Sequence, residues 1–183
     1  EHIIEIFITK LGLTPTNIPF LLTVLKLQGR KPNDYSSKLN INLDPDMRAD
    51  IAAKYIYSHL LKAIKDNEQG TIADTDSEFL HDFRVAVRRT RAGLNQLKGV
   101  LPDKIGVNYA EFFSWLGQIT GSTRDLDVYL LNYAQYKSSL PESIRDDLDP
   151  LYDFLLAKQQ TAHQELAKKL RSANYLSTLY EWE

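Results

Sequence analysis

The stretch "LHDFRVAVRRTRAGL" at residues 80–94 decides the fold expected for this chain. Its apolar residues recur every three or four positions, which is the spacing that places side chains on one face of an α-helix. Asp76 and Ser77 are N-cap candidates ahead of the stretch, and Pro102 is a stop signal beyond it. The sequence therefore predicts a helix from about Ser77 to Val100 with one buried face.

The charges of this helix occupy a second face, directly beside the apolar one. At about 100° per residue, the basic side chains share an arc of roughly 80° and extend about 15 Å along the axis. The predicted core stripe consists of Phe79, Phe83, Val87, Leu94 and Leu97, and the predicted basic face of His81, Arg84, Arg88 and Arg91. Arg89 falls alone on another side. Like charges at this spacing repel one another, so the pattern indicates a counter-charge supplied from elsewhere.

The basic face has no acidic residue of its own from Arg84 to Lys98. The planar guanidinium group of arginine suits bidentate contact with phosphate, and a bound anion would favour the charged form of His81. Two plainer interpretations stay open. The face is either solvated, with arginine stems covering apolar surface, or paired with acids from a neighbouring helix.

A second charged motif, "GSTRDLDVYL", follows at residues 121–130. It places Arg124, Asp125 and Asp127 in the first turn of a helix, where acids interact favourably with the helix dipole. Arg124 either pairs with Asp127 or is held by a carboxylate while it points at a ligand. A simple helix-capping cluster is the plain alternative.

The rest of the chain also follows a helical period, which predicts an all-α, antiparallel helical bundle. The further helices are expected at 45–66, 108–120, 122–138 and 142–170, with a polar loop at 67–76 and a short aromatic helix at the end. Gly121 is expected to cap the second of these helices in the left-handed conformation, and Pro150 to interrupt the last.

Length and composition fit one domain with an extension. The chain has 183 residues, 43% of them hydrophobic, and a net charge of −2. No apolar run approaches the roughly 20 residues that span a bilayer. The chain has no cysteine, which excludes disulfides and thiolate chemistry. The start at Glu1, the single methionine at Met47 and the aromatic end indicate a piece of a longer protein. Residues 1–43 are expected to be an N-terminal extension or the tail of an upstream domain, and 44–183 a helical domain.

Taken together, "LHDFRVAVRRTRAGL" and the later "WLGQITGSTRDLDVYL" (115–130) resemble the CHAD family, α-helical domains named for a histidine. The resemblance covers about 46–138 well and continues loosely to the end. It implies a bundle of two related four-helix halves around a basic surface, and binding of inorganic polyphosphate. The second basic helix of that family is not found, because "AHQELAKKLRSANYL" (162–176) lacks its spacing. Either the domain is incomplete at its C-terminal end or the pattern has eroded.

The resemblance also implies roles for individual residues. The implied anion contacts are His81, Arg84, Arg88, Arg91 and Arg124, with Arg89 a further candidate, while Asp125 and Asp127 would orient arginines. Lys54 and Lys62 are added from their charge alone. The expected activity is that of a cytoplasmic binding module at polyphosphate granules, not an enzyme, with no cofactor, metal or membrane. CHAD domains are often joined to a CYTH-type triphosphatase, so 1–43 could belong to one, although no Glu-x-Glu-x-Lys run occurs.

Two other functions remain as alternatives. His59, the pair His81-Asp82 and Asp125 occur in the order of HD-type metal phosphohydrolases, but the arginines beside His81 would disfavour a divalent ion. A nucleic-acid-binding module would also use a basic face. Most tyrosines fall at positions compatible with a core, and a pI near 6.1 argues against broad nucleic-acid binding.

Overall fold

The computed structural model describes residues 20–27 and 39–183. The chain divides into two compact units, Glu1–Ser36 and Ser37–Glu183. The first unit contains the helix α2, Phe20–Leu27. Within the expected N-terminal extension 1–43, residues 1–19 and 28–38 lie outside the described residues.

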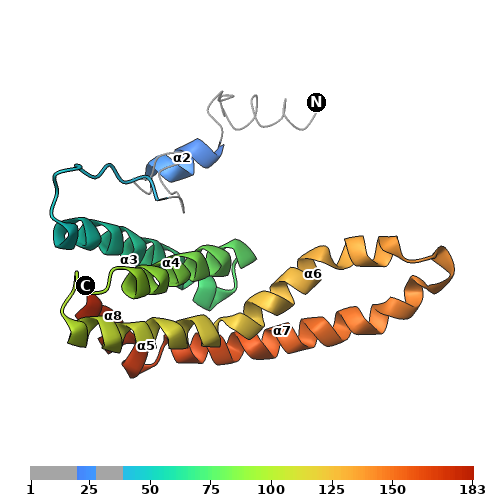
Figure 1. Ribbon diagram of the computed structural model, residues 1–183. Helices are drawn as coiled ribbons and strands as arrows, with labels where there is room; N and C mark the ends of the chain where they lie inside the picture. The colour runs from blue at the N-terminus through green and yellow to red at the C-terminus, as the bar shows by residue number, and fades with distance from the viewer. Residues whose placement is uncertain (1–19, 28–38) are drawn as a thin grey trace, which may run out of the picture. The chain divides into compact units, whose positions relative to one another are not determined.

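The second unit is built from α-helices, which confirms the predicted fold class (Figure 1). The helices are α3 Ala49–Ala73, α4 Ser77–Gln96, α5 Asp103–Ile119, α6 Gly121–Ser139, α7 Asp149–Leu170 and α8 Ala173–Trp182, with 3₁₀ turns at Glu142–Ile144 and Asp146–Leu148. No strand occurs in the described part of the chain. None of the helices described is both long and apolar enough to cross a membrane.

Helix α4 lies at the centre of this unit. It packs along α3, against α5 and against the start of α6, while α7 packs against α6 and α3. Figure 1 shows α5 and α6 following one another nearly end to end, with α7 running back beside α6. The core contains large side chains with almost no exposure, among them Phe83, Phe113, Leu116 and Tyr175. The basic face of α4 is therefore placed beside the junction between α5 and α6.

The local signals around α4 act largely as predicted. Asp76 is the N-cap, and its side chain accepts a hydrogen bond from the Glu78 N–H at 2.8 Å. Phe83, Val87 and Leu94 are buried as expected; the stripe also includes the buried Leu80, Ala86 and Thr90. The helix ends at Gln96 rather than Val100, and Gly99 turns the chain with a φ of 80°.

Other expectations about helix ends were also wrong, among them the starts expected at 45, 108 and 142, which lie at Ala49, Asp103 and Asp149. The polar stretch 67–76 is helical as far as Ala73, where Asp74 caps α3 in the left-handed conformation with a φ of 52°. Gly121 is not a left-handed cap, because α6 begins directly after Thr120, whose φ and ψ are −89° and −8°. Pro150 lies in the first turn of α7 and begins that helix rather than breaking it.

Two glycines provide a test of the α3–α4 packing. Gly70 lies in α3 against the Phe79 ring of α4, and a Cβ there would overlap the ring; a Cβ at Gly106 in α5 would meet nothing within 4 Å. Both substitutions to alanine improve helix propensity. We expect Gly70→Ala to lower the free energy of unfolding by about 1–3 kcal/mol through overpacking. Gly106→Ala should raise it by about 0.5–1 kcal/mol.

Urea denaturation followed by circular dichroism would measure both changes. If Gly70→Ala stabilises the protein as Gly106→Ala does, the close packing of α3 on Phe79 is wrong.

Candidate functional site

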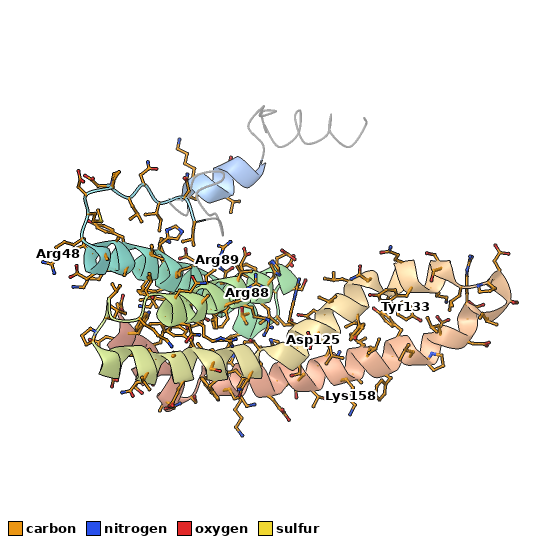
Figure 2. The ribbon with its side chains drawn as sticks, in the orientation of Figure 1. Arg48, Arg88, Arg89, Asp125, Tyr133 and Lys158 are labelled. Atoms are coloured by element: carbon orange, nitrogen blue, oxygen red, sulfur yellow. The ribbon has the colours of Figure 1, made fainter. Side chains whose placement is uncertain are left out.

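The cations of the two sequence motifs come together in one pocket of about 290 Å³ between α4 and α6. Figure 2 labels Arg88 on α4 and Asp125 on α6, the two helices that supply these cations. The residues that line the pocket, called here the arginine pocket, are His81, Arg84, Val85, Val87, Arg88, Arg91, Gly117 and Arg124. The arginine pocket thus contains every anion contact implied by the family resemblance except Arg89.

Arg84 is the most constrained of these cations. Its Nη1 donates hydrogen bonds to the Gly117 carbonyl oxygen at 3.0 Å and to Thr120 Oγ1 at 2.6 Å. Thr120 is fully buried, and its hydroxyl donates to the Leu116 carbonyl at 2.7 Å. Because both acceptors are fixed in the last turn of α5, the guanidinium group is held in one orientation.

Electrostatics at Arg84 reflect the crowding of positive charge. Burial lowers the pKa of its guanidinium group from the ordinary value, and the charges of Arg124 and Arg88 lower it further. The negative charge of Asp125 has the opposite effect on this pKa. Asp125 is exposed at the start of α6 and makes its contribution through charge rather than through a hydrogen bond to Arg84.

Two glycines lie beside arginine side chains of the pocket. A Cβ on Gly117 would lie 3.2 Å from Nη1 of Arg91, and a Cβ on Gly121 would lie 3.9 Å from Nη1 of Arg84. The first distance is tighter than most real contacts, so a side chain at position 117 would push Arg91 away from α5. Gly117 therefore allows the guanidinium group of Arg91 to lie against the helix backbone.

The pocket arginines and His81 form no direct ion pair with an acid among the described side chains. Among the described side chains of residues 39–102 and 106–183, no carboxylate oxygen lies within 4.0 Å of a side-chain nitrogen of His81 or of the four pocket arginines. Arg88 and Arg91 are exposed. Arg124 donates from Nη1 to the Ser77 carbonyl at 3.1 Å, not to Asp127. The ion-paired interpretation of the basic face thus finds no support among the described residues.

The remaining predicted residues lie elsewhere. Arg89 does not line the arginine pocket. Lys54 lines a different pocket with Tyr57 and Trp182, and Lys62 forms an ion pair with Asp66 at 2.6 Å.

Asp127 belongs to a separate polar cluster between α3, α6 and α7. It is only 5% exposed, and its Oδ1 accepts a hydrogen bond from Gln159 Nε2 at 3.0 Å. The same amide nitrogen donates to Asp74 Oδ2 at 3.2 Å. His163 extends the cluster, since its Nε2 lies 2.8 Å from the Thr71 carbonyl oxygen. Gln159 was not predicted, because a glutamine on an amphipathic helix gives no signal of burial.

This geometry gives little support to the two alternatives, a metal phosphohydrolase and a nucleic-acid-binding module. In the described ranges, no group of three or more His, Asp or Glu side chains is placed to hold a metal ion. Contrary to the expectation that most tyrosines would be core residues, five of the nine in the described residues are exposed: Tyr55, Tyr129, Tyr136, Tyr152 and Tyr180. None of them lines the arginine pocket, so base stacking there has no aromatic surface.

A helical bundle with an arginine pocket between two of its helices defines the class of protein, and comparisons with known proteins identify the family. The model of the CHAD domain matches residues 56–183, and the chain therefore belongs to the CHAD domain family. The chain is similar to the crystal structure of the CHAD domain from the plant Ricinus communis, with a TM-score of 0.66 and 26% sequence identity. The similarity covers 81% of this chain and 49% of the plant chain, so the protein described here spans about half that structure. A search of curated proteins gives no match.

The buried carboxyl group of Asp127 predicts a pH effect on stability. Burial raises its pKa above the ordinary value, and Gln159 only partly opposes this. An acid with a raised folded-state pKa binds more protons when folded, so its contribution to stability falls as pH rises between the unfolded and folded values. We expect Asp127→Asn, which keeps an acceptor for Gln159, to gain stability relative to the parent on going from pH 4 to pH 7.

Urea denaturation of both proteins at the two pH values provides the measurement. A difference in unfolding free energy that stays constant, or that moves in favour of the parent at pH 7, would show that folding does not raise the pKa of Asp127.

Proposed function

We propose that this chain is a binding module, not an enzyme, for inorganic polyphosphate or a similar linear phosphate polyanion. The observation that carries the proposal is the arginine pocket: four arginines and His81 from two helices, with no ion pair to an acid among the described side chains. Such an arrangement costs electrostatic free energy in the absence of a ligand, and an anion would offset that cost. Membership of the CHAD family supports the same ligand class.

The chemistry of the pocket favours phosphate over other anions. Arginine presents several N–H donors in a plane, which match the oxygens of a phosphate group. Arg84 and Arg124 are oriented by hydrogen bonds to the protein, while Arg88 and Arg91 are exposed. Arg84 and Arg124 would position the chain of phosphates, and Arg88 and Arg91 would contact further phosphates along α4. Joining to an upstream triphosphatase-type domain and association with polyphosphate granules stay predictions.

Removing the two exposed arginines tests the site without disturbing the fold. Arg88→Ala with Arg91→Ala deletes no hydrogen bond among the described residues, unlike Arg84→Ala, which would leave the Thr120 hydroxyl without its donor. Charge-assisted hydrogen bonds contribute about 1.5–3 kcal/mol each. We therefore expect the double variant to bind polyphosphate of defined length at least about 100-fold more weakly in calorimetric titration.

A matched control removes two charges elsewhere. Lys168 and Lys169 are exposed on α7 and do not line the arginine pocket. Lys168→Ala with Lys169→Ala should leave the affinity within about threefold of the parent, because screened distant charges contribute little. Absence of binding by the parent, or equal losses in the two double variants, would contradict the proposed site.

Salt dependence gives an independent test. Binding to a chain of phosphates releases its counter-ions, with a slope of log affinity against log salt of about −0.7 per neutralised charge for single strands. Four or five engaged cations predict a slope of about −3 for the parent. The Arg88→Ala, Arg91→Ala variant should have a slope shallower by about 1.4. A parent affinity that hardly changes between 50 and 300 mM salt would rule out an electrostatic site.

A further inference from the structure

The arginine pocket is bordered by a second, larger pocket of about 880 Å³ between the C-terminal part of α4 and the helix α5. Arg91 lines both pockets, so they meet at its side chain. The apolar part of the second lining consists of Leu94, Leu97, Leu101, Val107 and Ala110. The proposed polyphosphate function makes no use of this apolar surface, because a chain of phosphates has nothing apolar to bury there.

The second pocket has the features of a small-molecule site. Its volume falls in the range of about 300–1,000 Å³ that such sites occupy, and its lining is mostly apolar with a few polar groups. The polar side chains of the lining are Arg91, Asn95, Lys98, Glu111 and Ser114. Val107 is 60% exposed, so apolar surface at this pocket remains open to a ligand.

The order of residues along α4 indicates what kind of molecule fits both pockets. His81, Arg84 and Arg88 precede Arg91, and the apolar lining begins one turn later, at Leu94. A matching ligand has a row of phosphates and a single ring group at one end. We propose that the second pocket binds the base of a nucleoside polyphosphate, with its phosphates on the arginine pocket. This inference rests on the proposed function.

The polar groups of the second pocket fit an amino-bearing base. The Glu111 carboxylate can accept a hydrogen bond from an exocyclic amino group, and the Asn95 amide offers one donor group and one acceptor. Arg91 at the junction carries a planar cation that can contact a phosphate or stack on a ring. Lys98 on the same lining adds another positive charge.

A nucleic-acid strand fits this arrangement less well. It carries a base on every nucleotide and needs stacking surfaces along the whole groove, but no aromatic side chain lines the arginine pocket. A nucleoside polyphosphate has one base, at one end of its phosphates. In the described part of the chain, the apolar second pocket adjoins one end of the row of cations.

Calorimetric titration of the chain with ATP and with inorganic triphosphate, in the absence of divalent ions, tests the proposal. Both ligands have three phosphates, and inorganic triphosphate carries more negative charge because it has no ester linkage. Charge alone therefore favours inorganic triphosphate. We expect ATP to bind at least tenfold more tightly, and Arg91→Ala to weaken both ligands.

Val107→Ser and Ala110→Phe change the lining of the second pocket and leave the arginines in place, and Val128→Ser is their control. Val107→Ser changes an exposed side chain and should lower ATP affinity about three- to tenfold, with inorganic triphosphate unchanged. Val128→Ser, at an exposed valine on α6 outside both pockets, should change neither affinity. Ala110→Phe would fill the second pocket and should abolish the preference for ATP, with the fold checked by circular dichroism.

The outcomes separate the two proposals. If ATP binds no more tightly than inorganic triphosphate, or if Val107→Ser and Val128→Ser have the same effect, the base site is wrong and the polyphosphate site stands. If neither ATP, inorganic triphosphate nor polyphosphate binds, the proposed function fails and the base site fails with it.

Discussion

The hydrogen bonds of Arg84 to the last turn of α5 are the interaction on which the site depends. One guanidinium nitrogen contacts both the Gly117 carbonyl and the Thr120 hydroxyl, 33 and 36 residues away in the sequence. These bonds tie the basic face of α4 to the junction of α5 and α6. Because α6 begins directly after Thr120, they also fix where Arg124 enters the pocket. A surface helix with free arginines would lack this constraint.

The position of α6 depends in turn on a polar cluster on its other side. Asp127 lies one turn after Arg124, and the amide of Gln159 joins it to Asp74 at the end of α3. The cluster therefore connects α6 to both α3 and α7. Burying the Asp127 carboxyl group costs free energy, as its raised pKa indicates. The two acids of the Asp-x-Asp part of the motif thus have different roles. Asp125 acts on Arg84 through its charge, and Asp127 anchors the helix that carries Arg124.

The helix period was enough to predict α4, because its apolar and basic residues are each spaced for one face. The same reasoning could not place Arg124 in the pocket, since nothing local shows that the start of α6 lies beside α4; the family motif supplied that. Gly121 was misread as a cap because a glycine at a helix end has that meaning in most sequences. Here α6 begins at Gly121 directly after Thr120, an arrangement that the local sequence does not reveal. Gln159 and the apolar pocket beside Arg91 likewise arise from tertiary packing.

A net charge of −2 does not argue against a site for polyanions. Electrostatic interactions in water are screened over about 8 Å at physiological ionic strength. The row of cations on α4 extends about 15 Å, so every phosphate along it is within that distance of a guanidinium group. Acids farther away than the screening length contribute little to the field at the ligand. The net charge therefore affects how a polyanion approaches the protein from a distance. The local arrangement of Arg84, Arg88, Arg91 and Arg124 determines how strongly it binds.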